Sequence, residues 1–317
     1  MKYQPLVSII IPVYNGSNFV REAIDSALGQ TYENKEIIVV NDGSCDEGAT
    51  EEIVLSYKDK IRYIYKENGG VSSAINLGIE NMRGEYFSWL SHDDLYLPRK
   101  IELQVTSLNE YEKKDCLVLC GSQTVNAEGK VLHGPKKRDG IEEGFNEWHV
   151  ALNSMLMYGS YNGCALLIPK TAFEKSGGFD ETLRYCQDAL MWAKIFLNKF
   201  DLIYVSELGV SNRVHGGQLT QRGRSVFHRD SEKISQYLAP ELASQGEYAK
   251  KLLYSYAYHN AVLANGTVVK NCLKEAKNKA LFGLISRIKI KFAGLYGKIR
   301  PFIRKTYYKL FVKVKTQ

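Results

Sequence analysis

Short apolar segments alternate with amphipathic segments over the first hundred residues. The apolar segments are rich in β-branched and aromatic residues and are bounded by turn residues, so they predict strands; they span residues 6–13, 36–40, 61–66 and 86–90. The segments between them carry apolar residues at helical spacing and predict helices at residues 17–28, 46–57 and 71–82. The order βαβαβαβ, with near-continuous apolar strands, is typical of a parallel sheet covered by helices on both faces.

The remainder of the chain is less regular up to about residue 225 and wholly helical beyond it. Its predicted elements are a helix at 98–111, a strand, turn and strand over 116–131, a helix at 145–157, a strand at 164–168, a helix at 187–198 and two short strands at 202–205 and 211–214. We therefore predict a doubly wound α/β domain at 1–225 and a helical extension at 226–317.

Composition describes an ordinary folded protein whose charge is unevenly distributed. The net charge is +7, but residues 276–317 hold 12 Lys and Arg and no acidic residue, which leaves 30 basic against 35 acidic residues before them. The basic character thus belongs to the tail, and the body is mildly acidic. The six cysteines lack the spacing of a zinc site or a disulfide framework, which favours reduced thiols in the cytosol.

The N-terminal apolar run is interrupted by Pro12 and has no cleavage site after it, so we expect a buried strand and no signal peptide. No run of 18 apolar residues predicts a transmembrane helix. The tail instead has apolar residues in steps of three and four, at positions 281, 285, 288, 292, 295, 299 and 302. Pro301 is expected to kink or restart this helix, and Tyr307, Leu310, Phe311 and Val314 extend its apolar character.

An acid-free amphipathic helix of this kind suits the surface of an anionic membrane. A helix that packs against the rest of the protein or against a partner subunit, which leaves an oligomer possible, is the alternative. Binding to nucleic acid is disfavoured because a phosphate-binding arm gains little from large aliphatic residues.

Acidic residues follow two of the predicted strands. Asp42 ends the strand in VVNDGS, and Asp93 and Asp94 follow the strand in WLSHDD. Parallel strands end at the same rim of a sheet, where such carboxylates can hold Mg²⁺ or Mn²⁺ against a nucleotide diphosphate. In the loop KENGG, Asn68 and Gly70 precede a helix whose free N–H groups favour an anion. Helix capping and turn formation are the alternatives for each of these residues.

Four stretches together resemble the inverting family 2 glycosyltransferases, which have the GT-A fold. They read VSIIIPVYNGSNFVREAIDSALGQTY, KEIIVVNDGSCDEG, NGGVSSAINLGIENMRGEYFSWLSHDDLYLPRKIE and GGFDETLRYCQDALMW, and the resemblance covers roughly residues 6–215. It implies a Rossmann-like, mostly parallel central sheet with flanking helices. It also implies that Pro12, Tyr14 and Asp42 hold the base and ribose of a nucleotide, beside Asn68 and Gly70.

The resemblance also implies a metal site. The Asp-x-Asp element of the family corresponds to SHDD, where Ser91 replaces the first acidic residue. Asp93 is therefore the expected ligand of the metal and the diphosphate. Asp94 is expected to support Asp93 or to contact the ribose. His215 is a candidate additional ligand for Mn²⁺ or Mg²⁺, and Arg213 a candidate contact to the donor diphosphate. The loss of one carboxylate at position 91 lowers the negative charge of this site, which predicts weaker metal binding.

The general base implied by the resemblance is Asp188, in the string CQD, where Gln187 replaces the Glu of the family. A carboxylate there can take the proton of an acceptor hydroxyl, whereas the alternative is an Asp stabilised by the dipole at a helix start. Asp180 and Glu181 are candidates for the acceptor side, although turn chemistry explains them equally well.

These expectations combine into an inverting glycosyltransferase that is peripheral at the cytoplasmic face of the cell membrane. It would move a hexosyl or deoxyhexosyl group from a nucleotide diphosphate sugar to a lipid-linked glycan in cell-surface polysaccharide synthesis. A catalytically silent module that binds sugar nucleotides or membranes is one alternative. A nucleotidyltransferase is another, although PVYNGS lacks the Gly-rich loop with Lys or Arg that such enzymes carry.

Overall fold

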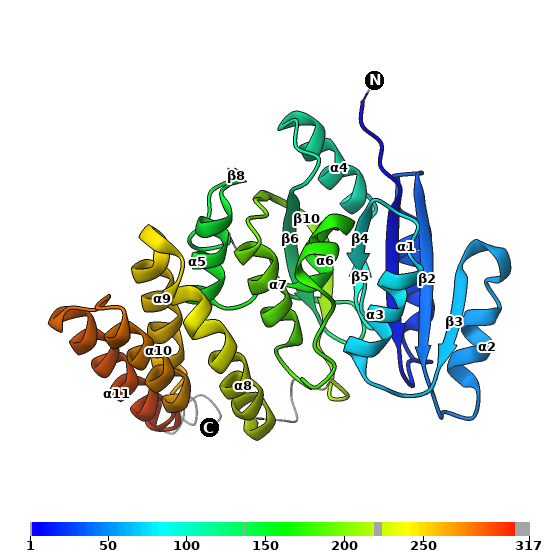
Figure 1. Ribbon diagram of the computed structural model, residues 1–317. Helices are drawn as coiled ribbons and strands as arrows, with labels where there is room; N and C mark the ends of the chain where they lie inside the picture. The colour runs from blue at the N-terminus through cyan, green and yellow to red at the C-terminus, as the bar shows by residue number, and fades with distance from the viewer. Residues whose placement is uncertain (1, 136, 219–223, 308–317) are drawn as a thin grey trace. The chain divides into compact units, whose positions relative to one another are not determined.

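The computed structural model describes residues 2–135, 137–218 and 224–307 (Figure 1). The chain forms two compact units. The first comprises Met1–Ala151 with Ser160–Arg224, and the second comprises Leu152–Gly159 with Ser225–Gln317. The division at residue 225 lies beside the expected domain boundary, but residues 152–159 group with the helical extension and not with the α/β domain.

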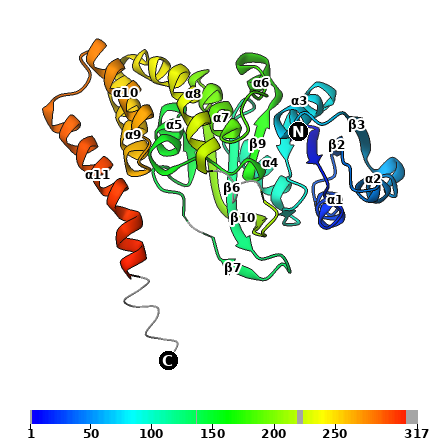
Figure 2. The ribbon, with the colours of Figure 1, turned by 90° about the horizontal axis from the view of Figure 1, so that it is seen from below.

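The first unit is built on one mixed sheet with helices on both faces. The strands are β1 Val7–Val13, β2 Lys35–Asp42, β3 Arg62–Lys66, β4 Tyr86–Trp89, β5 Leu95–Tyr96, β6 Leu117–Val125, β7 Val131–His133, β8 Gly144–Asn146, β9 Leu166–Pro169 and β10 Leu202–Arg213. The helices of this unit are α1 Val20–Leu28, α2 Ala49–Leu55, α3 Val71–Asn81, α4 Lys100–Glu110, α6 Lys170–Ser176 and α7 Gln187–Leu197. Helix α5 Trp148–Tyr158 begins in this unit and passes into the second unit after Ala151. Figure 2 shows α3 and α6 on one side of the sheet and α1 on the other.

The strands follow the order β3-β2-β1-β4-β9-β6-β10-β5. The first four are parallel, as are β6 and β10, whereas β9 is antiparallel to both of its neighbours. The α/β fold with flanking helices is therefore confirmed, with more antiparallel pairing in its second half than the sequence predicted. β7 and β8 pair with β6 and β10 at the side of this path.

The apolar sequence of β1 explains its central place in the sheet. All residues of β1 are buried, including Ile9, Ile10 and Ile11. Helix α3 approaches this strand closely at Gly78, where a Cβ atom would lie 2.5 Å from Cγ2 of Ile10. Only a glycine allows this approach, which seats α3 and the loop before it against the strands.

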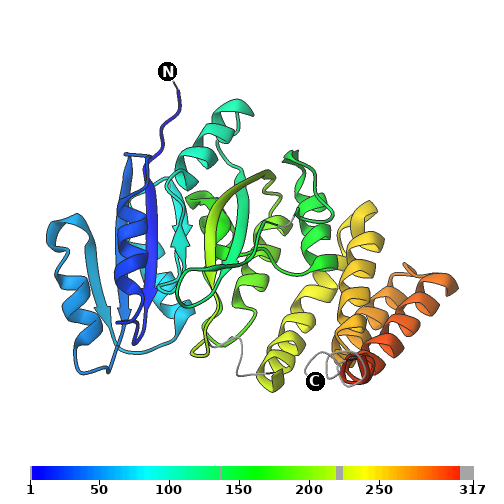
Figure 3. The ribbon, with the colours of Figure 1, turned by 180° about the vertical axis from the view of Figure 1, so that it is seen from behind.

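Two predictions for the second half of the sheet were wrong in detail. The predicted strands at 202–205 and 211–214 are one continuous strand, β10 (Figure 3). This strand shifts register against β6 between Val205 and Val210. These irregularities break the alternation from which a strand is recognised. The helix expected at 145–157 begins only at Trp148, because the residues before it form β8. Helix α6 was not predicted.

The second unit is helical, as predicted, and contains α8 Arg224–Ala243, α9 Ala249–Val262, α10 Gly266–Asn278 and α11 Leu284–Tyr307. Helix α11 continues across Pro301, so the helix does not restart there. The predicted apolar positions Leu310, Phe311 and Val314 lie outside the described residues. Within the described part of the chain, no helix combines the length and the apolar character that crossing a bilayer requires.

Candidate active site

The parallel strands β1, β2 and β4 bring three predicted positions to one edge of the sheet. Pro12 is buried in β1 and pairs with Val40, and Tyr14 follows the end of that strand. Asp42 is the last residue of β2, and Asp93 follows β4. Ligands of open α/β sheets bind at this edge, so Tyr14, Asp42 and Asp93 share the edge where a site is expected.

Asp42 holds the loop that follows β3. Its Oδ1 accepts hydrogen bonds from Lys66 Nζ at 2.8 Å and from the N–H of Gly69 at 2.9 Å, and its Oδ2 accepts from the N–H of Gly70 at 2.8 Å. Asn68 Nδ2 donates to the carbonyl of Asp42 at 2.9 Å. The N–H groups expected to meet an anion therefore meet this carboxylate. Donor binding by Asp42, Asn68 and Gly70 stays a prediction, and the structure shows that their hydrogen bonds join the end of β2 to the loop before α3.

The loops after β1 and β2 are joined by a cysteine that sequence reasoning did not single out. Cys45 lies 3.5 Å from the hydroxyl of Tyr14 and 3.5 Å from Asn15 Nδ2, and its N–H donates to Asn15 Oδ1 at 2.8 Å. Cys45 and Tyr14 are both exposed. The only sequence signal for Cys45 is its place directly after the NDGS string.

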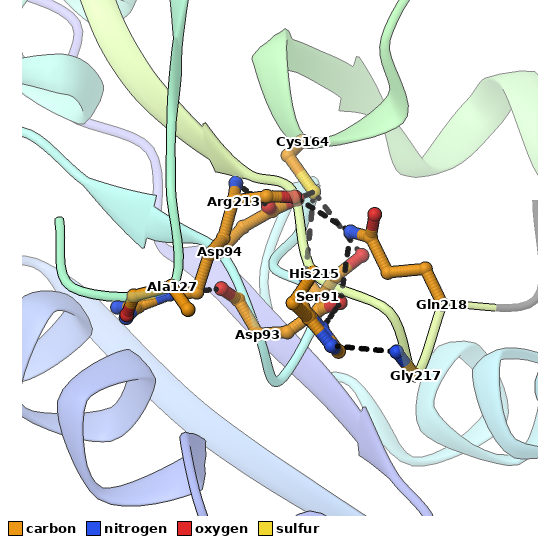
Figure 4. A network of polar contacts seen from close by, with 9 residues as sticks. All are labelled: Ser91, Asp93, Asp94, Ala127, Cys164, Arg213, His215, Gly217 and Gln218. Atoms are coloured by element: carbon orange, nitrogen blue, oxygen red, sulfur yellow. Dashed lines mark hydrogen bonds and ion pairs between the residues drawn. The ribbon is translucent and has the colours of Figure 1, made fainter. Parts of the chain in front are cut away.

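Asp93 and His215 form the pair that the sequence suggested as metal ligands (Figure 4). Asp93 Oδ2 lies 3.1 Å from His215 Nε2 and 3.3 Å from Gln218 Nε2. His215 Nδ1 accepts a hydrogen bond from the N–H of Gly217 at 3.2 Å, so in the neutral ring Nε2 carries the hydrogen and donates it to Asp93. The imidazole packs beside Phe19, with ring centroids 4.9 Å apart.

This pair has the spacing of two adjacent ligands of one ion. Ligands at about 2.1 Å in an octahedral shell lie about 3 Å from each other, and Asp93 Oδ2 and His215 Nε2 are 3.1 Å apart. Among the residues that the structure describes, no group of three or more His, Cys, Asp or Glu side chains could hold a metal. Within the described residues, the pair therefore provides one oxygen and one nitrogen atom, and metal binding by them stays a prediction.

Asp94 points away from this pair and into the protein. Its Oδ1 accepts a hydrogen bond from the N–H of Arg213 at 2.8 Å, and its Oδ2 lies 3.3 Å from Cys164 Sγ. Burial raises the pKa of Asp94 to about 7. Ser91, which stands where the family has an acid, contacts the same thiol at 3.4 Å. These contacts fit the supporting role predicted for Asp94, while a contact to the ribose stays a prediction.

Arg213 is buried and its guanidinium is engaged within the chain. Nε donates to the carbonyl of Asp93 at 3.0 Å, Nη1 donates to the carbonyl of Ala127, and Nη2 forms an ion pair with Glu22 at 2.7 Å. The guanidinium also lies over the ring of Phe19, 4.4 Å from its centroid. These interactions make Arg213 a positioning residue for Asp93, and its contact to the donor diphosphate stays a prediction.

Asp188 lies in the first turn of α7, after Cys186 in a left-handed conformation with φ of 58°. Its Oδ2 accepts a hydrogen bond from Ser160 Oγ at 3.3 Å, and burial raises its pKa. Ser160 begins a short segment whose other end, Cys164, contacts Asp94. Such a segment spans at most about 14 Å between its terminal Cα atoms. Asp188 and the Asp93–Asp94 pair are thus linked by a short piece of chain.

The turn before α7 joins the site to α3. Asp180 Oδ1 accepts from the N–H of Thr182 at 2.9 Å and from its hydroxyl at 2.7 Å, as expected of turn chemistry. Glu181 accepts a hydrogen bond from Asn76 Nδ2 at 2.8 Å, and Asn76 also bonds both backbone groups of Phe179. Acceptor-side roles for Asp180 and Glu181 stay predictions.

Lys100, the first residue of α4, is a buried cation, although lysines are mostly exposed and no pattern in the sequence marks this one. Its Nζ donates to Ser88 Oγ at 2.5 Å and to the carbonyl of Leu166 at 3.3 Å, and it lies 4.1 Å from the ring centroid of Tyr96. Burial lowers its pKa to about 8. Lys100 therefore connects α4 to β4, β5 and β9.

Comparisons with known proteins identify the family. The family model described as "Glycosyl transferase family 2" matches residues 8–159. An uncharacterized glycosyltransferase of Rickettsia prowazekii is 50% identical over 238 residues, which cover 74% of this chain and 72% of the relative. One from Haemophilus influenzae is 30% identical over 247 residues, with coverage of 76% and 74%.

Among solved structures, TarS 1-349 of S. aureus in complex with UDP-GlcNAc superposes with a TM-score of 0.69 at 17% identity, over 95% of this chain and 92% of TarS. The same TarS fragment in complex with UDP gives a TM-score of 0.67 at 18% identity. At these identities the likeness establishes the fold alone, which is GT-A. With this fold and these relatives, the chain belongs to glycosyltransferase family 2.

Proposed function

We propose that this chain is an inverting glycosyltransferase that moves a sugar from a nucleoside diphosphate onto a hydroxyl group of a glycan. Family membership supports sugar transfer, and the UDP and UDP-GlcNAc complexes of TarS support a nucleotide sugar as the class of donor. The observation that carries the proposal is the Asp93–His215 pair at the strand ends, joined by a short segment to the Asp188 carboxylate.

Asp93 and His215 would hold Mn²⁺ or Mg²⁺ through the two atoms that lie 3.1 Å apart, with the hydrogen of the neutral imidazole then on Nδ1 and not on Nε2. When bound, the cation would neutralise the negative charge that develops on the departing nucleoside diphosphate. A site with two protein ligands suits this role, because Mg²⁺ is usually held by one or two carboxylates together with phosphate oxygens and water. Arg213 keeps the backbone of Asp93 in place.

Asp188 would act as the general base. Its carboxylate takes the proton of the acceptor hydroxyl while the hydroxyl oxygen attacks the anomeric carbon from the face opposite the leaving diphosphate, which inverts the configuration. Burial raises the pKa of Asp188, and a carboxylate with a raised pKa is a stronger base once it is ionised. The hydroxyl of Ser160 orients the carboxylate through its hydrogen bond to Oδ2.

The test compares Asp188→Asn with the native protein after a thermal-shift screen with Mn²⁺ has identified the nucleoside diphosphate sugar that binds. The variant keeps the shape of the side chain but cannot accept a proton, so the transfer rate should fall by about 10²- to 10⁴-fold. Donor affinity, measured by calorimetry, should stay unchanged. Asp59→Asn is the matched control, because that carboxylate is exposed before β3 and belongs to no part of the candidate site. Full transfer activity in Asp188→Asn would refute the assignment of the base.

The same enzyme is proposed to work at the cytoplasmic surface of the membrane on a lipid-linked glycan, held there by α11. Three residues of the predicted apolar stripe are exposed in the structure: Ile288 at 41%, Phe292 at 68% and Leu295 at 56%. The face of α11 that packs against α9 is a different one, formed by the buried residues Ile290, Ala293 and Gly297. Packing within the chain therefore leaves the basic, apolar face available for a membrane.

Flotation with phosphatidylglycerol vesicles tests this part separately. The intact chain should float with the vesicles, and a triple change of Ile288, Phe292 and Leu295 to Ser should stay at the bottom of the gradient. If the native chain fails to float, the membrane proposal is refuted while the catalytic proposal stands.

A further inference from the structure

A groove of about 340 Å³ opens in the second unit between α11 and the junction of α9 with α10. Its volume is that of a small-molecule site. Val269, Leu273 and Ile290 line its apolar part, and Lys291 and Lys298 belong to its lining on α11. The groove is therefore amphipathic, with hydrocarbon surface and ammonium groups together.

Two glycines of α11 explain why the groove exists. At Gly297 a Cβ atom would lie 2.6 Å from the carbonyl oxygens of Ala261 and Val262, so α11 touches the backbone of α9 there. At Gly294, almost one turn earlier, the nearest neighbouring atom is the Cβ of Ala261 at 4.0 Å. The helices are in close contact at one glycine and separate at the other, which leaves the apolar space uncovered.

The charge around the groove selects an anionic occupant. Lys291 and Lys298 are exposed and seven residues apart, which places them on the same side of α11 two turns from each other. No acidic residue occurs in 276–317, and α10 carries three lysines against one glutamate, Glu275. Self-occupation by residues 308–317 is disfavoured because that segment carries three lysines and no acid. A second copy would bring the same positive charge.

We propose that this groove binds one acyl chain of an anionic membrane phospholipid, with the phosphate between Lys291 and Lys298. The inference rests on the membrane association proposed above and names the site and the lipid. Leu295 belongs both to the lining of the groove and to the exposed stripe of α11. An acyl chain can thus pass from the face that meets the bilayer into the groove, where Val269, Leu273 and Ile290 surround it.

Two variants of the intact chain test the site. Gly294→Leu fills the groove without a backbone clash, since its new Cβ meets nothing closer than 4.0 Å. Displacing about two methylene groups of the lipid should weaken binding to phosphatidylglycerol vesicles about tenfold. Lys291→Gln with Lys298→Gln removes the phosphate partners. The matched control is Arg287→Gln with Lys289→Gln, which removes the same charge from exposed positions of α11 outside the groove lining.

A phosphatidylglycerol with a photoreactive acyl chain provides the direct measurement. Labelled peptides should come from 261–273 and 290–298 in the native chain, and Gly294→Leu should lose this labelling while keeping the native melting temperature. The variant with Lys291→Gln and Lys298→Gln should bind phosphatidylglycerol vesicles more weakly than the control with Arg287→Gln and Lys289→Gln. Equal binding by these two variants, or unchanged labelling of Gly294→Leu, would overturn the proposal while membrane association stands.

Three further results would also overturn it: equal labelling by photoreactive phosphatidylcholine, labelling by prenyl phosphate but not by phosphatidylglycerol, and a dimer that Gly294→Leu dissociates. Failure of the native chain to bind any vesicle would instead refute the membrane association itself.

Discussion

Lys100 should make the free energy of unfolding of the protein increase as the pH rises from about 8 to 10.5. Burial lowers its pKa from 10.5 to about 8, so the native state holds this proton less tightly than the unfolded chain. At neutral pH the ammonium is buried at a cost of about 3 kcal/mol, because each tenfold change in proton affinity corresponds to about 1.4 kcal/mol. The cost is fully present below pH 8 and disappears as the pH rises to 10.5.

Replacing Lys100 with Met removes this cost and also removes the hydrogen bonds to Ser88 and to the carbonyl of Leu166. The hydrogen-bond contribution is common to both pH values, so the pH dependence isolates the charge. We expect the free energy of unfolding of Lys100→Met, relative to the native protein, to be about 2 to 3 kcal/mol more favourable at pH 7 than at pH 10. The groups beside Lys100 largely keep their protons between pH 7 and pH 10. Burial raises the pKa of Tyr96 well above its usual value of 10 and that of Cys120 to about 11.

Urea unfolding of both proteins at pH 7 and pH 10, followed by tryptophan fluorescence, measures this difference. Lys60→Met, at an exposed position, is the control and should show no such dependence on pH. If the native protein and Lys100→Met differ by the same amount at both pH values, Lys100 is not a buried ammonium with a lowered pKa, and the reasoning fails.

The remaining predictions concern the Asp93–His215 pair, the hydrogen bonds of Asp42 and helix α11. His215→Ala should raise the Mn²⁺ concentration that half-saturates activity by about ten- to a hundredfold in a titration at fixed donor; an unchanged requirement would remove His215 from the metal site. Asp42→Ala should lower the free energy of unfolding by about 3 kcal/mol in urea, because Lys66 and two loop N–H groups lose their partner; Lys66→Met in the same chain should recover part of that loss, and no recovery would contradict the ion pair. Gly297→Leu should cost about 1 to 3 kcal/mol through overpacking and speed proteolysis of α11, whereas Gly294→Leu should do neither.

The first half of the sheet could be predicted from sequence because its strands are wholly buried. An uninterrupted apolar run such as β1 has one plausible place in an α/β protein, at the centre of a parallel sheet. The second half could not be predicted in the same way. β10 shifts register twice against β6. Each shift interrupts the alternation of buried and exposed side chains along the strand, so the sequence pattern resembles two short strands.

Some residues of the candidate site could likewise be predicted from the sequence, and others could not. Asp93 and Asp188 could be named because recognisable strings of residues surround them. The partners of Arg213 could not, since the guanidinium binds Glu22, which lies 191 positions away in the chain. Nothing in the local sequence distinguishes an arginine that contacts a ligand from one that anchors a loop. The burial of Lys100 could not be predicted either, because it results from the packing of α4 against three strands, which no local pattern in the sequence marks.

The contacts of Arg213 also limit which loops of this enzyme tolerate insertions and deletions. One guanidinium fastens helix α1 through Glu22, the loop after β4 through Asp93 and the β6–β7 turn through Ala127. An insertion or deletion in that turn would therefore displace Asp93 without contacting it directly. Attempts to alter sugar preference by loop exchange should spare the turn at 126–129, whereas the exposed Tyr14 and Cys45 can be exchanged with little strain on the scaffold.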